Sequence, residues 1–397
     1  MTLAFWLSLA VIVYTYAGYP LAIIGLARLR KKKKRQYRWW QRGIRPVSLV
    51  MAVHNGESKI EAQLDYLLQL EREVIGEIFV VSDGSTDATN AILRGMEASR
   101  CDDRLQLILL DEQVGKASAL NHGIAAATAE ILLFVDLRPR IREGSVNLLI
   151  ENFADRRVGC AAGELRLKTL GHDGTAKVVS GLYWRYEQAI RKAESTYDSP
   201  VGVYGGFYAV RRAAVSFLPE GCILDDMFQP LSVIRQGYRS VLDRHAVVTD
   251  VWPAKAKGEF ARKVRTLAGN FQLVTQCPWV LTPQNRVLFQ LISHKLLRLV
   301  VPYCFVLLLV TSAMLGRAGH RGMLIVTALQ LAGWLLALLS LRWTLPLVGR
   351  IATPAGAMLM LNAAAVVGLY RFLFTRRPLW KSLWVPTPTP MKKTRLA

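Results

Sequence analysis

Cysteine is scarce in this sequence and follows no pattern that would use it. The five cysteines are odd in number and far apart, with no CxxC pair and no histidine at metal-ligand spacing: Cys101, Cys160, Cys222, Cys277 and Cys304. A zinc module needs paired cysteine or histidine ligands, and a disulfide framework needs paired cysteines. Both are therefore excluded, and we expect reduced, buried thiols in a protein that faces the cytosol.

Acidic residues are also few. The sequence has 29 Asp and Glu against 51 Lys and Arg, which gives a formal net charge of +22. Such a charge suits nucleic acid, an anionic membrane surface or an anionic substrate. A basic cluster between Arg28 and Arg45 follows an apolar run directly, where cytoplasmic juxtamembrane anchors lie. No helix-turn-helix, zinc-finger or aromatic RNA-binding pattern accompanies it, so it predicts an anionic lipid surface and no nucleic acid.

Hydrophobic residues make up 52% of the chain and gather at its two ends. Residues 3–27 form an uncharged run long enough to cross a bilayer, without the positive start or cleavage site of a signal peptide. The positive-inside rule places the N-terminus outside and residue 30 onward in the cytoplasm. Further apolar spans follow at 296–316, 323–341 and 354–374. Three such spans would put the tail outside, whereas its basic residues favour inside, and a re-entrant segment at 344–353 would reconcile the two.

The middle of the chain has the pattern of a parallel sheet. Near-continuous apolar runs at 47–53, 77–83, 105–111 and 130–136 alternate with helix-period stretches such as 57–71 and 86–99. Such runs predict buried parallel strands covered on both faces. Ligands bind at the carboxyl ends of strands in open sheets of this kind. We therefore expect Asp83, Asp111 and Asp136, which end these runs, to lie along one edge.

The segment VVSDGSTDATNAI places Asp83 and Gly84 at a strand end and Ser85, Thr86 and Asp87 at a helix start. These are ordinary turn and helix-capping residues. A carboxylate at a strand tip can equally accept hydrogen bonds from a base edge or from ribose hydroxyls. Beyond residue 255 the pattern becomes amphipathic, with apolar residues at helical spacing opposite basic ones, and predicts a helix at the membrane surface.

Seven motifs in one order resemble glycosyltransferase family 2, especially its membrane-bound branch of cellulose, hyaluronan and poly-N-acetylglucosamine synthases. They are VMAVHNGE (50–57), VVSDGSTD (80–87), GKASALNHGI (115–124), EILLFVD (130–136), GGFYAVRR (205–212), LDDMFQPLSVIRQGY (224–238) and RKVRTLAGNFQ (262–272). The resemblance covers residues 46 to 300. It implies an α/β GT-A (Rossmann-like) catalytic domain with transmembrane α-helices.

The resemblance assigns donor-binding roles. Asp83 would contact the base of a nucleotide sugar, expected to be a UDP-sugar, and Lys116 would lie near the donor unless it is a solvated lysine at a helix start. Asp136 matches the first acid of a DxD motif that holds Mg²⁺ or Mn²⁺ against the diphosphate. Arg138 stands where the second acid is expected. Three explanations fit: Asp136 holds the metal with substrate oxygens and water, Arg138 partly replaces the metal, or the protein is catalytically impaired.

The resemblance also assigns the acceptor side. Asp226 matches the general base, with Asp225 as its acidic neighbour, although two acids at a helix start also suit the helix dipole. Gly205, Gly206, Phe207 and Tyr208 match a loop beside the acceptor, or else form a buried turn. Arg265 matches the arginine of the QxxRW motif that steadies the diphosphate. Arg262 and Thr266 replace the glutamine and tryptophan of that motif, which leaves processivity open.

These observations predict the following organisation: a transmembrane helix (1–28), a basic juxtamembrane segment (29–45), a cytoplasmic GT-A domain (46–255), interface helices (256–295), about three transmembrane helices (296–375) and a basic tail (376–397). The expected activity is inverting sugar transfer at the inner membrane that builds an exported or envelope polysaccharide on a saccharide acceptor. Two alternatives are transfer of one sugar to a lipid carrier and a degenerate nucleotide-binding scaffold. An accessory export subunit or a homo-oligomer is a further expected partner.

Overall fold

The computed structural model describes residues 1–30, 46–168, 174–251, 256–342, 349–375 and 378–382. The chain divides into two compact units, and each is described by itself. Unit 1 combines Met1–Lys32, Thr169–Val201 and Ala254–Arg376. Unit 2 combines Lys33–Lys168, Gly202–Pro253 and Arg377–Ala397. Each unit is therefore assembled from segments that are far apart in the sequence.

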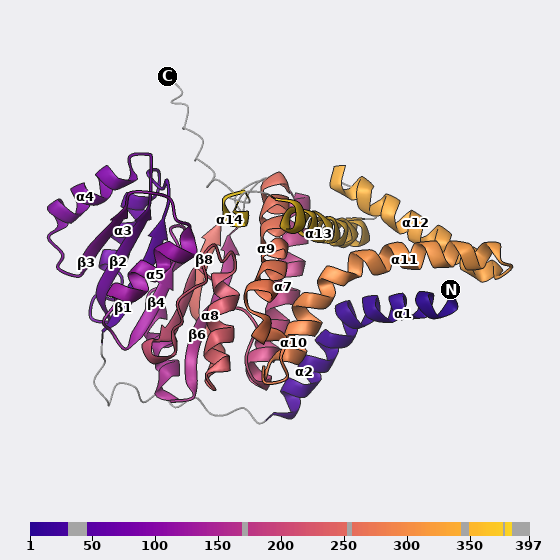
Figure 1. Cartoon of the computed structure of the whole chain (residues 1–397), viewed down its shortest axis with the longest axis horizontal. Coiled ribbons are helices and arrows are strands. Elements are labelled where there is room, and N and C mark those ends of the chain that lie inside the picture. Colours follow the sequence, from indigo (N-terminus) through magenta and orange to yellow (C-terminus); the bar gives the residue numbers. More distant parts are fainter. Residues whose placement is uncertain (31–45, 169–173, 252–255, 343–348, 376–377, 383–397) are drawn as a thin grey trace, which may run out of the picture. The chain divides into compact units, whose positions relative to one another are not determined.

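Unit 2 is built on a sheet whose described strands run in the order β3-β2-β1-β4-β7-β6-β8-β5 (Figure 1). The strands are β1 (Val47–Val53), β2 (Ile75–Asp83), β3 (Leu105–Leu110), β4 (Ile131–Val135), β5 (Arg140–Ile141), β6 (Val158–Lys168), β7 (Phe207–Arg211) and β8 (Arg239–Val251). Strands β1 to β4 pair in parallel, which confirms the predicted sheet. Strand β7 pairs antiparallel with β4 and β6, and thereby extends the sheet beyond the predicted part.

Burial on both faces explains why the four parallel strands have continuous apolar sequences. In β1 every residue except Ala52 is fully buried, so no position remains for a polar, solvent-facing side chain. Helix α3 buries Ile60, Leu64 and Leu67, which lie on one face at helical spacing. The helices of unit 2 are α3 (Ile60–Gln69), α4 (Thr89–Arg100), α5 (Lys116–Ala126), α6 (Ser145–Ile150), η3 (Glu151–Ala154), η4 (Arg212–Ala214), α8 (Asp225–Arg235) and α14 (Leu379–Ser382).

Unit 1 is helical in its described residues. Its helices are α1 (Thr2–Val13), η1 (Tyr14–Gly18), α2 (Tyr19–Leu29), α7 (Gly174–Tyr197), α9 (Ala256–Gln276), η5 (Pro278–Leu281), α10 (Leu288–Gln290), η6 (Leu291–Leu296), α11 (Leu297–Arg317), α12 (Arg321–Arg342) and α13 (Gly349–Phe374). Helix α1 runs alongside α11 (Figure 1), and Phe5 and Ile12 pack there against Leu308. The segments η1 and η6 are π-helical turns next to α1 and α11, and they meet where the Tyr14 hydroxyl lies 2.9 Å from Ser293 Oγ.

Four helices among the described residues are long and apolar enough to cross a membrane. They are Thr2–Leu29, Leu288–Arg317, Arg321–Leu341 and Pro354–Phe374. On α12, Ile325 is 64% exposed and Leu329 is 68% exposed, an apolar surface that is costly in water but suited to lipid. Helices that could span a membrane by their length and composition therefore lie at both ends of the described chain, where the sequence analysis expected them. Residues 344–348 of the expected re-entrant segment and most of the basic segments 29–45 and 376–397 lie outside the described residues, whereas residues 349–353 begin α13.

All five cysteines are free, as predicted, but one expectation about them is wrong. Cys160, Cys222 and Cys277 are buried, whereas Cys101 is exposed. Cys101 follows the last turn of α4 with a left-handed backbone (φ 46°), which leaves its side chain at the surface. Burial raises the pKa of the Cys160 thiol to about 12, so this thiol stays protonated at neutral pH.

The contact between α5 and β1 gives a prediction about stability. A Cβ at residue 123 would lie 2.5 Å from Val50 Cγ1, so Gly123→Ala should overpack this layer and destabilise unit 2 by about 1–3 kcal/mol. The matched control is Gly95→Ala on α4, where a Cβ meets nothing within 4 Å. The control should raise the melting temperature slightly because alanine favours a helix. Thermal unfolding of the purified variants is the measurement, and equal melting temperatures would contradict the packing.

Candidate active site

Asp83 lies at the carboxyl end of β2 and is held by the backbone of the next loop. Its Oδ1 accepts a hydrogen bond from the Val114 N–H at 2.7 Å, and both its oxygens lie within 3.1 Å of the Gly115 nitrogen. Gly115 has φ +94°, a conformation that glycine adopts without strain. The carboxylate is 97% buried yet fixed in position by these donors, so strand and loop together determine where it points. Its contact with a donor base stays a prediction.

The loops that follow β1 and β2 brace each other. The Asn55 side-chain oxygen accepts from the Thr86 N–H at 2.8 Å, and Asp87 Oδ2 accepts from the Glu57 N–H at 3.1 Å. Asp87 Oδ1 also accepts from the Thr89 N–H at 3.0 Å, which caps the start of α4. The polar residues of the VHNGE and SDGSTD motifs therefore have a structural role in shaping the edge of the sheet next to Asp83.

Lys116 lies between two carboxylates at the start of α5. Its Nζ is 2.9 Å from Asp136 Oδ1 and 3.0 Å from Asp225 Oδ2. Burial by itself would lower the pKa of Lys116, but Asp136 and Asp225 outweigh it and raise this pKa above its usual value. The lysine is therefore charged at neutral pH. This ion pair brings together two residues predicted on the donor side and one predicted on the acceptor side.

The two acids at the start of α8 lie against the glycine loop, and the resemblance had assigned both to the acceptor side. A Cβ on Gly205 would be 3.1 Å from Asp226 Cβ and 3.8 Å from Asp225 Oδ2. The Val203 N–H donates to the Asp226 carbonyl oxygen at 2.9 Å, which ties the loop to the first turn of the helix. Asp225 is buried and Asp226 is half-buried, so of the two Asp226 has more of its surface open to an acceptor.

Arg138 has a partner that sequence reasoning missed. Its guanidinium is 3.4 Å from Asp250 Oδ2, and the Tyr204 hydroxyl donates to the same oxygen at 3.0 Å. Burial, together with the negative charges of Asp250 and Asp136, raises the pKa of Tyr204 well above its usual value, so the hydroxyl remains a donor. Asp250 ends β8, more than a hundred residues from Arg138, and no motif in the sequence marks it.

Two predicted acceptor residues need correction. Phe207 and Tyr208 are fully buried in β7, and the Tyr208 ring stacks on Phe134 with a centroid distance of 4.8 Å. Neither ring has a face available to a sugar, because strand pairing between β4 and β7 directs them into the core. The predicted contact of Gly205 and Gly206 with an acceptor stays a prediction. Arg265 lies on α9 in unit 1, so its predicted contact with the diphosphate stays a prediction.

The carboxylates also bear on whether a metal ion fits. Among the described residues no group of three or more His, Cys, Asp and Glu side chains converges as metal ligands do. Asp136 is 38% exposed and can offer one carboxylate to a divalent cation, with Lys116 beside it. A hard cation needs about six oxygen ligands. The residues therefore fit a cation only if most of its ligands come from a bound diphosphate and from water.

Comparison with known proteins shows what part of this chain is similar to. Residues 48–216 match the model of the family described as Glycosyl transferase family 2. An N-acetylglucosaminyltransferase of Rhizobium meliloti (strain 1021) is 25% identical over 206 residues, covering 49% of this chain and 48% of that protein. A poly-beta-1,6-N-acetyl-D-glucosamine synthase of Staphylococcus aureus (strain COL) is 23% identical over 232 residues, 57% of this chain and 55% of that protein. The chain thus spans about half the length of these relatives.

A solved structure shares the fold. The mannosyltransferase PcManGT from Pyrobaculum calidifontis, in complex with GDP-Man and Mn²⁺, matches with a TM-score of 0.72 at 20% identity. The match covers 94% of this chain and all of that one. It confirms the predicted GT-A fold. The nucleotide sugar and the Mn²⁺ in that complex are bound to the mannosyltransferase.

The close approach of Gly205 to Asp226 gives a prediction about turnover. Gly205→Ala should push the Asp226 side chain by a few tenths of an ångström and lower kcat about tenfold, since small displacements of reacting groups are costly. Gly322→Ala on α12, where a Cβ meets nothing within 4 Å, is the control and should leave kcat unchanged. Steady-state kinetics of both variants measure the effect. A Gly205→Ala protein with the kcat of the control would mean that the loop does not position Asp226.

Proposed function

We propose that this chain, whose residues 48–216 match the model of glycosyltransferase family 2, is a glycosyltransferase that transfers sugar from a UDP-sugar with inversion at the cytoplasmic membrane. The product is an exported or envelope polysaccharide. The single observation that carries this proposal is the ion pair of Lys116 with Asp136 and Asp225. It joins the two sides that a sugar transferase must bring together, the donor and the acceptor.

The chemistry is one displacement with Asp226 as the base. The Asp226 carboxylate accepts the proton of the acceptor hydroxyl, and the hydroxyl oxygen forms a bond to the anomeric carbon. The bond from that carbon to the diphosphate breaks on the opposite side, and its electron pair leaves with the nucleoside diphosphate. One displacement inverts the anomeric configuration. Lys116 pairs with Asp225 and offsets its negative charge. Asp225 therefore does little to oppose ionisation of the adjacent Asp226 carboxyl group.

Positive charge is needed where the diphosphate leaves. The Lys116 ammonium and the Arg138 guanidinium are two described cations at the edge that carries Asp136, and phosphate oxygens are good partners for both. Asp136 is the residue that would hold a divalent cation together with the diphosphate. Such an ion would supply further neutralisation of the leaving group when bound.

The names of the relatives suggest the first substrate to test. Both curated relatives are named for N-acetylglucosamine, and one is a polymer synthase, so UDP-N-acetylglucosamine is the proposed donor and a growing glycan the proposed acceptor. GDP-mannose, held by the structural neighbour, is the competing donor. Four membrane-crossing helices in the same chain suit a product that is made at the membrane and passed across it.

Asp226→Asn tests the proposal directly. In proteoliposomes with UDP-N-acetylglucosamine, the wild type should release UDP and the variant should be slower by about 10²- to 10⁴-fold, because an amide cannot accept the proton. Asp103→Asn, an exposed carboxylate elsewhere in unit 2, is the matched control and should keep full activity. Released UDP and the mass of the product are measured together.

The outcomes separate the alternatives. A product that grows by repeated sugar units supports the polymer, whereas a single sugar on a lipid shows transfer to a carrier. Activity with GDP-mannose and none with UDP-N-acetylglucosamine would show that GDP-mannose is the donor. Equal UDP release by Asp226→Asn and the wild type would show that Asp226 is not the base. If no nucleotide sugar were turned over, the protein would instead be the degenerate nucleotide-binding scaffold.

Asp136 is the single carboxylate at the proposed cation position, so a cation would need further oxygen ligands from a nucleotide diphosphate. We therefore predict that cation and nucleotide bind together. Calorimetric titration should show Mn²⁺ binding to the protein with UDP present and none without it, after subtraction of Mn²⁺ binding to free UDP. Asp136→Asn should abolish the joint binding. Asp111→Asn, which follows β3 at the edge of the sheet and is exposed, is the control and should keep it. Tight Mn²⁺ binding to the protein alone would contradict the one-carboxylate site.

A further inference from the structure

The turn that carries Arg138 has a backbone that is fixed on both sides of this residue. Pro139 follows Arg138 directly and disfavours helical backbone conformations for it. The Gln63 side chain on α3 donates to the Pro139 carbonyl oxygen at 3.0 Å. On the other side Leu137 packs against Gly56, where an added Cβ would lie 2.8 Å from Leu137 Cδ2. The direction of the Arg138 side chain then depends on its own contacts.

Asp250 determines where the Arg138 side chain points. Arg138 Nη2 lies 3.4 Å from Asp250 Oδ2, and Asp250 is the only carboxylate that pairs with Arg138 among the residues that the structure describes. Asp250 Oδ1 accepts a hydrogen bond from the Val251 N–H at 2.7 Å. The Asp250 side chain is 6% exposed, whereas that of Arg138 is 36% exposed. A buried carboxylate thus holds a guanidinium that is itself partly open to solvent.

Tyr204 fixes this carboxylate in turn. Its hydroxyl donates to the same Asp250 Oδ2 at 3.0 Å. The ring is held as well, because a Cβ on Gly206 would lie only 2.7 Å from Tyr204 Cε1 and 2.8 Å from Pro139 Cγ. The Tyr204 ring and Pro139 therefore both lie against a glycine that leaves no room between them. With its ring and hydroxyl both fixed, Tyr204 leaves Asp250 Oδ2 little freedom to turn away from Arg138.

Tyr204 lies in the loop that also meets the proposed base. The Val203 N–H donates to the Asp226 carbonyl oxygen at 2.9 Å, and the glycine after Tyr204 lies against the Asp226 side chain. The Tyr204 hydroxyl therefore connects this loop, through Asp250, to a cation on the predicted donor side. It forms a second link between the two sides, beside the ion pairs of Lys116.

An arginine needs such support more than a metal ion does. A divalent cation attracts oxygen ligands from all sides, whereas a guanidinium binds phosphate through N–H donors that lie in one plane. The long arginine side chain also loses rotational freedom when it binds a ligand, and a partner that holds it beforehand lowers this entropic cost. Arg138 stands where a second acidic metal ligand was expected, so a fixed carboxylate beside it suits a cation that must be aimed.

We propose that Tyr204 and Asp250 are positioning residues that orient Arg138 toward the diphosphate of a bound nucleotide. This inference rests on the proposed function, because the diphosphate is that of the sugar donor. Arg138 makes the contact with phosphate oxygens, and Tyr204 and Asp250 act only through it. Loss of the Tyr204 hydroxyl should therefore weaken binding of a nucleoside diphosphate and leave binding of the nucleoside unchanged.

Double-mutant binding measurements test whether Tyr204 acts through Arg138. Calorimetric titration of the purified full-length chain, with Mn²⁺ present throughout, gives the affinities for UDP and for uridine. Tyr204→Phe should weaken UDP binding about fivefold, the usual effect of one hydrogen bond, and Arg138→Gln about twentyfold. The double variant should bind UDP no more weakly than Arg138→Gln alone, because Tyr204 then has no cation to orient. All variants should bind uridine as the wild type does, which also shows that they are folded.

Tyr66→Phe is the matched control. The Tyr66 hydroxyl on α3 donates to the Ile141 carbonyl oxygen, so this substitution removes a tyrosine hydroxyl that supports unit 2 through a different partner. Its affinity for UDP should equal that of the wild type. Equal losses in Tyr204→Phe and Tyr66→Phe would reduce the effect to a general loosening of unit 2 and would overturn the proposal.

Two further results would contradict the positioning role. If Tyr204→Phe lost the same factor in UDP affinity with and without Arg138, the hydroxyl would not act through that arginine. If UDP and uridine binding fell together, the variant would disturb the base site rather than the diphosphate contact.

Failure of the proposed function gives a different pattern. Coupled losses of UDP binding in a protein that turns over no nucleotide sugar would support the positioning role and contradict the transfer reaction. If GDP bound in place of UDP, the same coupling measured with GDP and guanosine would support the positioning role and change only the donor. Absence of binding to either nucleoside diphosphate would contradict both proposals.

Discussion

Lys116 lies between Asp136 and Asp225, and this double ion pair is the interaction around which the catalytic unit is organised. Asp136 follows β4, Asp225 begins α8, and Lys116 begins α5, so one ammonium connects three elements at one edge of the sheet. Without it two carboxylates would face each other partly buried, which raises the free energy of both ionised forms. The charge needed to hold a diphosphate is thereby also the charge that keeps the acids together.

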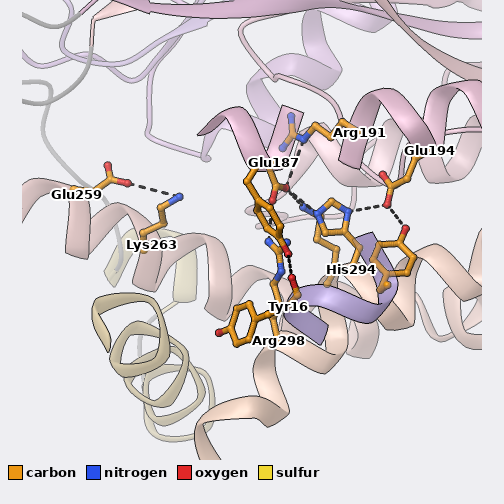
Figure 2. A network of polar contacts seen from close by, with 11 residues as sticks. Tyr16, Glu187, Arg191, Glu194, Glu259, Lys263, His294 and Arg298 are labelled. Carbon is orange, nitrogen blue, oxygen red and sulfur yellow. Dashed lines mark hydrogen bonds and ion pairs between the residues drawn. The ribbon is translucent and has the colours of Figure 1, made fainter. Parts of the chain in front are cut away.

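The imbalance between bases and acids has different consequences in the two units. In unit 2 the cations Lys116 and Arg138 are each matched by a carboxylate, so they are fixed in place before any substrate binds. In unit 1 the acids are fewer, and the buried Glu187 on α7 pairs with both Lys295 and Arg298 (Figure 2). A single carboxylate there connects the helix α7 with the segment that leads into α11.

Much of the architecture was predictable from the sequence because it depends on local patterns. The continuous apolar runs that became β1 to β4 are long enough to be buried on both faces, and the uncharged runs at the ends are long enough to cross a bilayer. Strand direction then placed Asp83 and Asp136 at one edge, since parallel strands end on the same side. The two acids of α8 and the glycine loop were also predicted to lie together, and they do.

Tertiary structure alone decided which partner each charge has and which way each ring points. Asp250 and Tyr204 reach Arg138 only because β8 folds back beside β6, and no spacing in the sequence records that pairing. Phe207 and Tyr208 belong to a motif, yet antiparallel pairing of β7 with β4 buries both rings. The sequence by itself determined the four parallel strands, the apolar helices long enough to span a membrane and the order of the motifs, because these follow from residue periodicity and length. The ion pairs of Lys116 and Glu187 join residues far apart in the chain, so only the folded structure could determine them.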